Sequence, residues 1–133
     1  FIQTYQPNHP VIKSSINADY KWFVNYELNE RRKNFLPPFS SFISIIINSA
    51  NENKARAYGS NLRNLIKENF PNIVLFGPSP SIIFKQNKIF RFRILIKLKK
   101  NLKSGAIFKN FLTKIIPPNG IKIYIDVDPI NFT

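Results

Sequence analysis

Hydrophobic and basic residues alternate along one segment of the chain, KIFRFRILIKLKK at positions 88–100. Successive side chains of a β-strand point to opposite faces of the sheet, so the pattern predicts a strand with two unlike faces. The apolar face carries Phe90, Phe92, Ile94, Ile96 and Leu98. The opposite face carries Arg91, Arg93, Lys97 and Lys99. We expect the first face to pack in a core and the second to face anions.

The other apolar patterns after residue 38 complete an order of strand, helix, strand, strand, helix, strand. We expect strands at 42–48, at 73–76 and 81–85, at 89–98 with a turn at 86–88, and at 121–127. One helix is predicted from a capping box of Ser49 and Glu52 to Pro71, and another over 102–116. The GPSPS segment at 77–81 is interpreted as a stiff crossover between strands. This order predicts an α+β fold, a ferredoxin-like (split βαβ, βαββαβ) two-layer sandwich with both helices on one face of the sheet.

An N-terminal helical extension is expected before this domain. Residues 1–6 have the composition of the end of a strand, and Pro10 favours a short helix through Ile16. Asp19 is a good N-cap for a helix over 20–33, whose apolar residues on more than one side favour packing between two bodies. Two prolines in FLPPFSS, 35–41, then forbid helix continuation, so we expect the main domain to begin at residue 39.

The charge of the chain is strongly basic and unevenly distributed. Twenty Lys and Arg against seven Asp and Glu give a formal charge of +13, and residues 71–133 hold eleven basic and two acidic side chains. Such a surface attracts polyanions. The absence of cysteine excludes disulfides and thiolate metal ligands. Without a membrane-length apolar run or a signal-peptide pattern, a cytoplasmic protein with no membrane contact is expected. The start at Phe1 and the lack of Met suggest a piece of a longer protein.

Nucleic-acid binding is the first interpretation of the basic strand face, because spaced Arg and Lys neutralise phosphates and release counterions. Lys85, Lys88 and Lys122 extend the candidate patch, and Tyr124 offers a ring for stacking. The alternative is a solvated face whose charges only keep the domain soluble. An RNA-recognition module would place aromatic residues where this strand has arginines, which favours backbone or shape contact over base reading.

Three other groups of polar residues are candidates for chemistry. Asp126 and Asp128 share a strand face, but without a third acidic residue or a histidine nearby, ion pairing with Arg or Lys is favoured over a metal or acid–base site. His9 has no visible catalytic partner, which favours an interdomain hydrogen bond. Arg31, Arg32 and Lys33 suit the C-terminal end of a helix dipole, with phosphate contact as the alternative.

Five segments in order carry a family resemblance: IQTYQPNHPVI (2–12), YELNERRKNFLPPFS (26–40), LFGPSPSII (75–83), FRFRILIK (90–97) and DVDPINF (126–132). Together they resemble the C-terminal region of the PriA family of bacterial replication-restart DNA helicases, also called primosomal protein N-prime. The resemblance implies that 1–10 end the second helicase lobe as its last strand, that 11–38 form a helical linker, and that 39–133 form a DNA-binding accessory domain.

The resemblance also implies what the parent protein does: an ATP-dependent 3′ to 5′ helicase acts at replication forks and single-stranded DNA. The nucleotide-binding motifs and zinc-binding cysteines of the family do not occur in this segment, so the parent's ATP, magnesium and zinc are not expected here. No family catalytic residue maps onto the segment, which should be inactive alone. Expected partners are DNA, other domains of the parent, and primosome and single-strand-binding proteins. The alternatives are an interdomain or primosome protein-docking module without DNA contact, and a small enzyme using Asp126 and Asp128.

Overall fold

A computed structural model describes residues 1–99 and 102–129 of the chain. The backbone divides into two compact units, Phe1–Phe39 and Ser40–Thr133. Their boundary lies one residue from the predicted start of the main domain. Each unit is described by itself.

The first unit consists of α1 (Pro10–Ile16) and α2 (Tyr20–Lys33), with the bounds that the sequence predicts. The Asp19 carboxylate caps α2 by accepting a hydrogen bond from the Trp22 N–H at 3.0 Å. No residue of α2 is buried, and the rings of Trp22 and Tyr26 stack 5.0 Å apart. Residues 1–6 are neither helix nor strand in this structure. A strand needs a neighbour for its backbone hydrogen bonds. The neighbours expected for 1–6 belong to the second helicase lobe, so that expectation stays a prediction.

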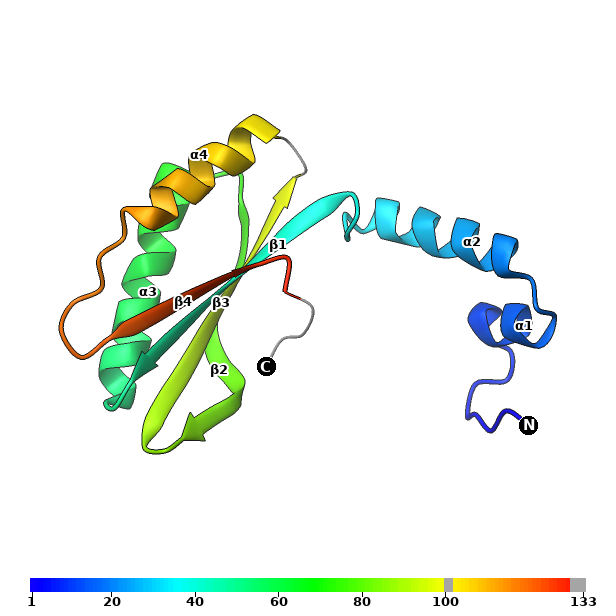
Figure 1. Ribbon diagram of the computed structural model, residues 1–133, viewed down its shortest axis with the longest axis horizontal. Coiled ribbons are helices and arrows are strands. Elements are labelled where there is room, and N and C mark those ends of the chain that lie inside the picture. The colour runs from blue at the N-terminus through cyan, green and yellow to red at the C-terminus, as the bar shows by residue number, and fades with distance from the viewer. Residues whose placement is uncertain (100–101, 130–133) are drawn as a thin grey trace. The chain divides into compact units, whose positions relative to one another are not determined.

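The second unit is an antiparallel sheet with helices packed on it, which confirms the predicted α+β class. In chain order it contains β1 (Ser40–Ser49), α3 (Glu52–Asn69), β2 (Val74–Gln86), β3 (Ile89–Lys99), α4 (Leu102–Thr113) and β4 (Lys122–Val127). The four strands lie in the order β2-β3-β1-β4, and every neighbouring pair is antiparallel. Figure 1 shows α3 and α4 together on one side of this sheet.

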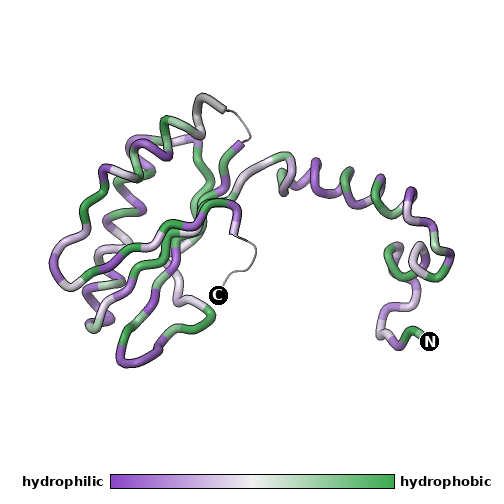
Figure 2. The backbone as a smooth tube through the Cα atoms, viewed as in Figure 1, coloured by the Kyte–Doolittle hydropathy of each residue, from purple (hydrophilic) through white to green (hydrophobic). Residues whose placement is uncertain are grey.

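One hydrophobic core joins the two helices to the inner face of the sheet. Ile45 of β1 and Ile94 of β3 are paired across the strands and fully buried. The helices contribute Leu62 and Ile66 from α3 and Phe108 from α4 to the same cluster. Hydrophobic and hydrophilic residues alternate along the strands in Figure 2, as expected when one sheet face is covered and the other is not.

The N-terminus of α3 differs from the predicted capping box. Asn51 is the N-cap, and its side-chain oxygen accepts a hydrogen bond from the Lys54 N–H at 3.0 Å. Ser49 is still in β1, where its hydroxyl accepts from the Asn51 N–H at 3.2 Å and donates to the Gly120 carbonyl at 2.9 Å. Ser49 therefore ties the end of β1 to the loop before β4. Ser49 is not the N-cap because β1 continues to Ser49, and the N-cap is therefore Asn51.

The GPSPS segment is part of β2, so its interpretation as a crossover is wrong. The pairing of β2 with β3 continues through the segment with irregularities between Phe76 and Ser79 and between Pro80 and Lys85. Such bulges let a strand carry residues that cannot pair regularly, prolines included. The hairpin then turns at Asn87 and Lys88, which both have positive φ angles of 51° and 64°.

Two further elements, α4 and β4, are shorter than predicted. The helix α4 ends at Thr113 rather than at residue 116, and β4 begins at Lys122 rather than at residue 121. Ile121 is nevertheless buried in the core.

Candidate nucleic-acid interface

The sheet face opposite the helices, here called the open face, is defined by strand register. Phe92, Ile94 and Ile96 of β3 are buried against the helices, so the residues between them point the other way. Residues directly opposite in paired strands share a face. The open face therefore has a row of Arg91, Asn48 and Lys122, a row of Arg93, Ile46 and Tyr124, and rows that include Leu95, Ser44, Asp126 and Lys97 with Phe42.

The basic residues predicted from alternation do share this face. Arg91, Arg93 and Lys97 are half-buried and Lys99 is exposed. Lys122 joins them from β4, because it pairs with Asn48, which in turn pairs with Arg91. The structure thus brings cationic side chains of two strands together on one side of the sheet.

Two predicted residues lie apart from this group. Lys85 is paired with Phe90, which lies on the face opposite to Arg91 because the two are consecutive in β3. The Lys85 ammonium lies 4.7 Å from the centre of the Phe90 ring. That contact places Lys85 on the helix side of β3. Lys88 is in the turn of the β2–β3 hairpin.

The open face also carries apolar groups that the sequence reasoning passed over. Leu95 lies between Arg93 and Lys97 on the same face, and Phe76 of β2 is its partner. The Phe76 side chain is 53% exposed, and that of Tyr124, on the opposite edge of the sheet, is 54% exposed. The sequence does indicate an apolar residue on this face, because Leu95 occupies a position where the alternation predicts a polar residue. Exposed rings beside cations can stack unpaired bases.

The two aspartates of β4 have different environments. Asp128 closes the β1–β4 pairing: its carboxylate accepts from the Phe42 N–H at 3.0 Å, and its own N–H donates to the Phe42 carbonyl at 2.7 Å. The expected ion pair with Arg or Lys is replaced at Asp128 by this backbone contact. Asp126 lies opposite Ser44 on the open face. Within 1–99 and 102–129, no group of three or more His, Cys, Asp or Glu is placed to hold a metal ion.

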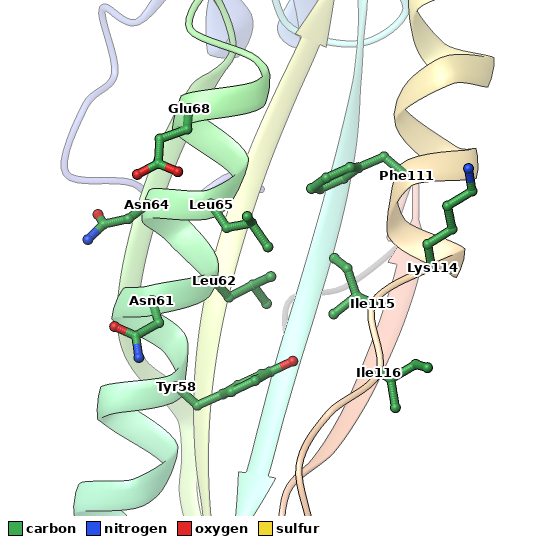
Figure 3. A pocket seen from close by; sticks show the side chains of 10 residues that line it. All are labelled: Tyr58, Asn61, Leu62, Asn64, Leu65, Glu68, Phe111, Lys114, Ile115 and Ile116. Carbon is green, nitrogen blue, oxygen red and sulfur yellow. The ribbon is translucent and has the colours of Figure 1, made fainter.

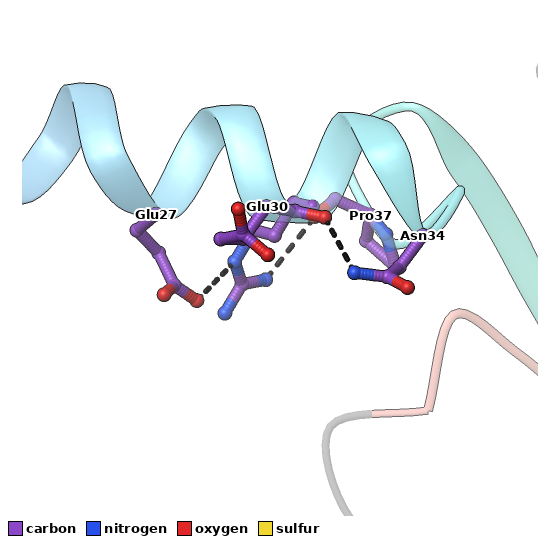
Figure 4. A network of polar contacts seen from close by, with 5 residues as sticks. Glu27, Glu30, Asn34 and Pro37 are labelled. Atoms are coloured by element: carbon purple, nitrogen blue, oxygen red, sulfur yellow. Dashed lines mark hydrogen bonds and ion pairs between the residues drawn. The ribbon is translucent and has the colours of Figure 1, made fainter.

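The basic end of α2 makes contacts within its own unit (Figure 4). Arg31 forms an ion pair with Glu27 at 2.7 Å and donates to the Pro37 carbonyl at 3.1 Å, which ties the helix to the segment that follows. Lys33 pairs with Glu30 at 2.8 Å, and this hydrogen bond and the charge of Glu30 raise the Lys33 pKa above its usual value. His9 likewise makes a local contact, because its Nδ1 accepts from the Val11 N–H at 3.3 Å. These residues have structural partners without any phosphate.

A groove of about 760 Å³ runs between α3 and α4. In Figure 3, Leu62 and Leu65 of α3 point toward Phe111 of α4 and Ile115 beyond it. Burial raises the pKa of Tyr58, which also lines this groove. Apolar residues of both helices and of the segment after α4 make up most of its lining, and Leu65 and Ile116 there are exposed.

Comparison with known proteins places the chain in a family. Residues 32–130 match the primosomal protein N C-terminal domain. The replication restart protein PriA of Synechocystis sp. is 30% identical over 131 residues, which are 98% of this chain and 16% of that protein. PriA of Rickettsia felis is 28% identical over 132 residues, covering 99% of this chain and 20% of that protein. PriA of Bacillus subtilis is 27% identical over 132 residues, covering 96% and 16%.

The chain thus spans about a fifth or less of the length of these relatives. In the described part of the chain, no helix is long and apolar enough to cross a membrane. The family match covers all four strands and the two helices packed on them, and the relatives extend the similarity into the N-terminal unit. The chain belongs to the primosomal protein N C-terminal domain family.

Proposed function

We propose that this chain is a DNA-binding accessory domain of a longer replication restart protein, and that the open face contacts DNA phosphates. The observation that carries the proposal is the gathering of Arg91, Arg93, Lys97, Lys99 and Lys122 on the sheet face that the helices leave uncovered. Phosphate neutralisation by such residues releases counterions and supplies most of the sequence-independent affinity for DNA. Binding through backbone contacts suits a protein that acts at forks and single strands of any sequence.

The parent protein's activity belongs to the same proposal. A restart helicase would use ATP to move 3′ to 5′ on DNA, and its ATP, magnesium and zinc would be held by parts of the chain beyond these residues. The present domain would hold DNA for that motor in the cytoplasm of a bacterium. Other domains of the parent, primosome proteins and single-strand-binding proteins are its proposed protein contacts.

We also infer a ferredoxin-like, split βαβ topology for the second unit. In its sheet, β3 lies between β1 and β2, and β1 lies between β3 and β4. The crossovers from β1 to β2 and from β3 to β4 each contain one helix, and both helices join one core. These are the relations that a split βαβ arrangement requires.

A second function, protein docking on the same face, is favoured by one observation. The exposed ring of Phe76 beside Leu95 gives the open face an apolar patch as well as its charges. A docking surface of this kind would bind a protein with an affinity that depends little on salt. A surface that binds DNA phosphates would lose affinity steeply as the salt concentration rises.

Fluorescence anisotropy of labelled single-stranded, duplex and forked DNA tests the proposal across a salt titration. We expect affinity to fall steeply with salt, and the double variant Arg91→Glu/Arg93→Glu to weaken binding and lower the salt slope by about 1 to 2. The matched control is Lys109→Glu/Lys114→Glu, which makes the same change in charge on exposed positions of α4 or just after it. Equal losses in both double variants, or no binding at low salt, would overturn the assignment of the open face.

The same variants test the assignment of faces. Ile94 is fully buried, so Ile94→Asp should unfold the domain by burying an unpaired charge. The arginine reversal should leave the circular dichroism spectrum and melting temperature nearly unchanged. An unfolded arginine reversal would mean that the faces are assigned wrongly.

A further inference from the structure

The open face has a hollow at the end where β1 leads to α3 and a loop leads into β4. Its volume is about 430 Å³, within the range of pockets that hold small ligands. Its lining includes Asn48, Lys122, Tyr124, Ile89 and the loop residues Asn119 and Gly120. The register adds Arg91 beside it, because Asn48 pairs with Lys122 on one side and with Arg91 on the other.

Two polar atoms at this end of the sheet are buried without a hydrogen-bond partner: the Asn48 side-chain oxygen and the Arg91 Nε. An unpaired buried donor or acceptor costs about 1–3 kcal/mol, so native structures satisfy most of them. Here an acceptor and a donor belong to directly paired residues, and Asn48 lines the hollow. The Asn48 oxygen needs a hydrogen-bond donor, which an N–H group of a nucleobase supplies and a phosphate does not.

The electrostatics of the hollow favour an anion. None of the described residues lining it is acidic, and Lys122 is exposed at its edge. The Lys54 ammonium donates to the Asn119 carbonyl at 2.6 Å, which fixes the loop and adds a positive charge beside it. The exposed ring of Tyr124 lies in the same lining. Cations, an amide oxygen that accepts a hydrogen bond and one aromatic ring are together the kinds of group that bind a nucleotide.

We propose that this hollow holds one unpaired nucleotide of single-stranded DNA, with its base stacked on Tyr124 and its phosphate held by Lys122 and Arg91. The Asn48 side-chain oxygen accepts a hydrogen bond from an N–H group of the same nucleotide's base. A base within a duplex has both faces covered by its neighbours, so stacking on Tyr124 selects an unpaired base. This inference rests on the proposed binding of DNA by the open face and assigns to that face a strand type and a stacking residue.

The test separates the base from the phosphates. Binding of the 133-residue chain is measured by anisotropy with oligothymidylate and with a strand of equal length in which abasic sites replace the bases, so that the charge is the same. We expect oligothymidylate to bind about ten-fold more tightly, because one stacked base contributes on the order of that factor. Tyr124→Ala should remove this preference and leave the abasic strand unaffected, whereas Tyr124→Phe should keep it. Tyr5→Ala, which removes another fully exposed ring, is the matched control.

A second measurement locates the base directly. A single strand containing 5-iododeoxyuridine is crosslinked to the chain by ultraviolet light, and the modified residue is identified by mass spectrometry. We expect the crosslink at Tyr124, and Asn48→Ala should reduce its yield several-fold without lowering the melting temperature, because no hydrogen bond of the Asn48 oxygen is lost.

The outcomes distinguish the inference from the function on which it rests. Failure of both strands to bind at low salt would overturn DNA binding itself. Equal, salt-dependent binding of both strands, or a crosslink confined to other residues, would leave phosphate binding in place and overturn the nucleotide pocket.

Discussion

Gly77 is held in a backbone conformation that other residues rarely adopt. Its φ is 96°, and a Cβ at this position would lie 2.4 Å from the Arg93 carbonyl oxygen of the neighbouring strand. The bulge in β2 therefore depends on the missing side chain. We expect Gly77→Ala to lower the free energy of unfolding by about 1–3 kcal/mol or more, measured by urea denaturation.

Gly105 provides the control for that substitution. It lies within α4, and a Cβ there would meet no atom within 4 Å. Alanine favours a helix over glycine by about 0.5–1 kcal/mol, so Gly105→Ala should stabilise the domain by up to that amount. Similar effects of the two substitutions would show that the strain at Gly77 is absent in solution.

Tyr58 makes the stability of the domain sensitive to alkaline pH. Burial raises the pKa of its phenol above the ordinary value of about 10. The neutral phenol is therefore favoured in the folded state, and this stability is fully present below pH 10 and lost as the pH rises through the folded pKa. Between pH 8 and pH 11, we expect the melting temperature of Tyr58→Phe to fall less than that of the parent chain. Parallel curves for the two proteins would rule out the shift.

Residue-level predictions succeeded where they depended on local alternation and failed where they depended on pairing. The faces of Arg91 and Arg93 follow from a strand period of two, which needs no partner. The face of Lys85 does not follow from this period. The bulges in β2 shift its register, and only the pairing with β3 determines by how much. Whether the Asn48 oxygen and the Arg91 Nε have hydrogen-bond partners depends on the residues of neighbouring strands, so no sequence pattern predicts that they lack them.

At the scale of the element, α3 owes its start to one side chain. Asn51 accepts a hydrogen bond from the Lys54 N–H, one of the donors that the first turn leaves unpaired. We expect Asn51→Ala to lower the free energy of unfolding by about 1 kcal/mol in urea denaturation.

Asn53 is the matched control, because it is an exposed asparagine inside the same helix. Asn53→Ala should be neutral or slightly stabilising, since alanine is the better helix former. A loss of about 1 kcal/mol in the free energy of unfolding for Ser49→Ala, with none for Asn51→Ala, would show that Ser49 is the N-cap, as the predicted capping box requires.

The GPSPS stretch in the middle of β2 shows why element boundaries are harder to predict than element types. Two prolines within five residues normally end a strand, and here they lie in an irregular stretch that keeps pairing on both sides. Pro78 also packs against α3, where a Cβ on Gly59 would lie 2.9 Å from the Pro78 Cβ. The segment is therefore retained in the sheet by a tertiary contact that its composition does not reveal.

At the scale of the whole molecule, charge and family resemblance were the most informative signals. The basic excess of residues 71–133 pointed to the half of the chain that contains β3 and β4. Alternation then assigned that charge to one face, and the match of 32–130 to the primosomal protein N C-terminal domain gave the family. The hollow beside Tyr124 required the sheet order, because its lining comes from segments far apart in the chain.

The distribution of burial between the two units predicts how the chain tolerates truncation. Every residue of the hydrophobic core lies in Ser40–Thr133, whereas Ser14 is the one buried residue in Phe1–Phe39. We expect residues 40–133 alone to unfold cooperatively, with a melting temperature within about 5 °C of the full chain. Residues 1–39 alone should have little helical circular dichroism, because α1 and α2 contain only 7 and 14 residues and isolated helices of such length are marginal in water. A shortened chain that failed to fold would mean that the first unit contributes to the core of the second.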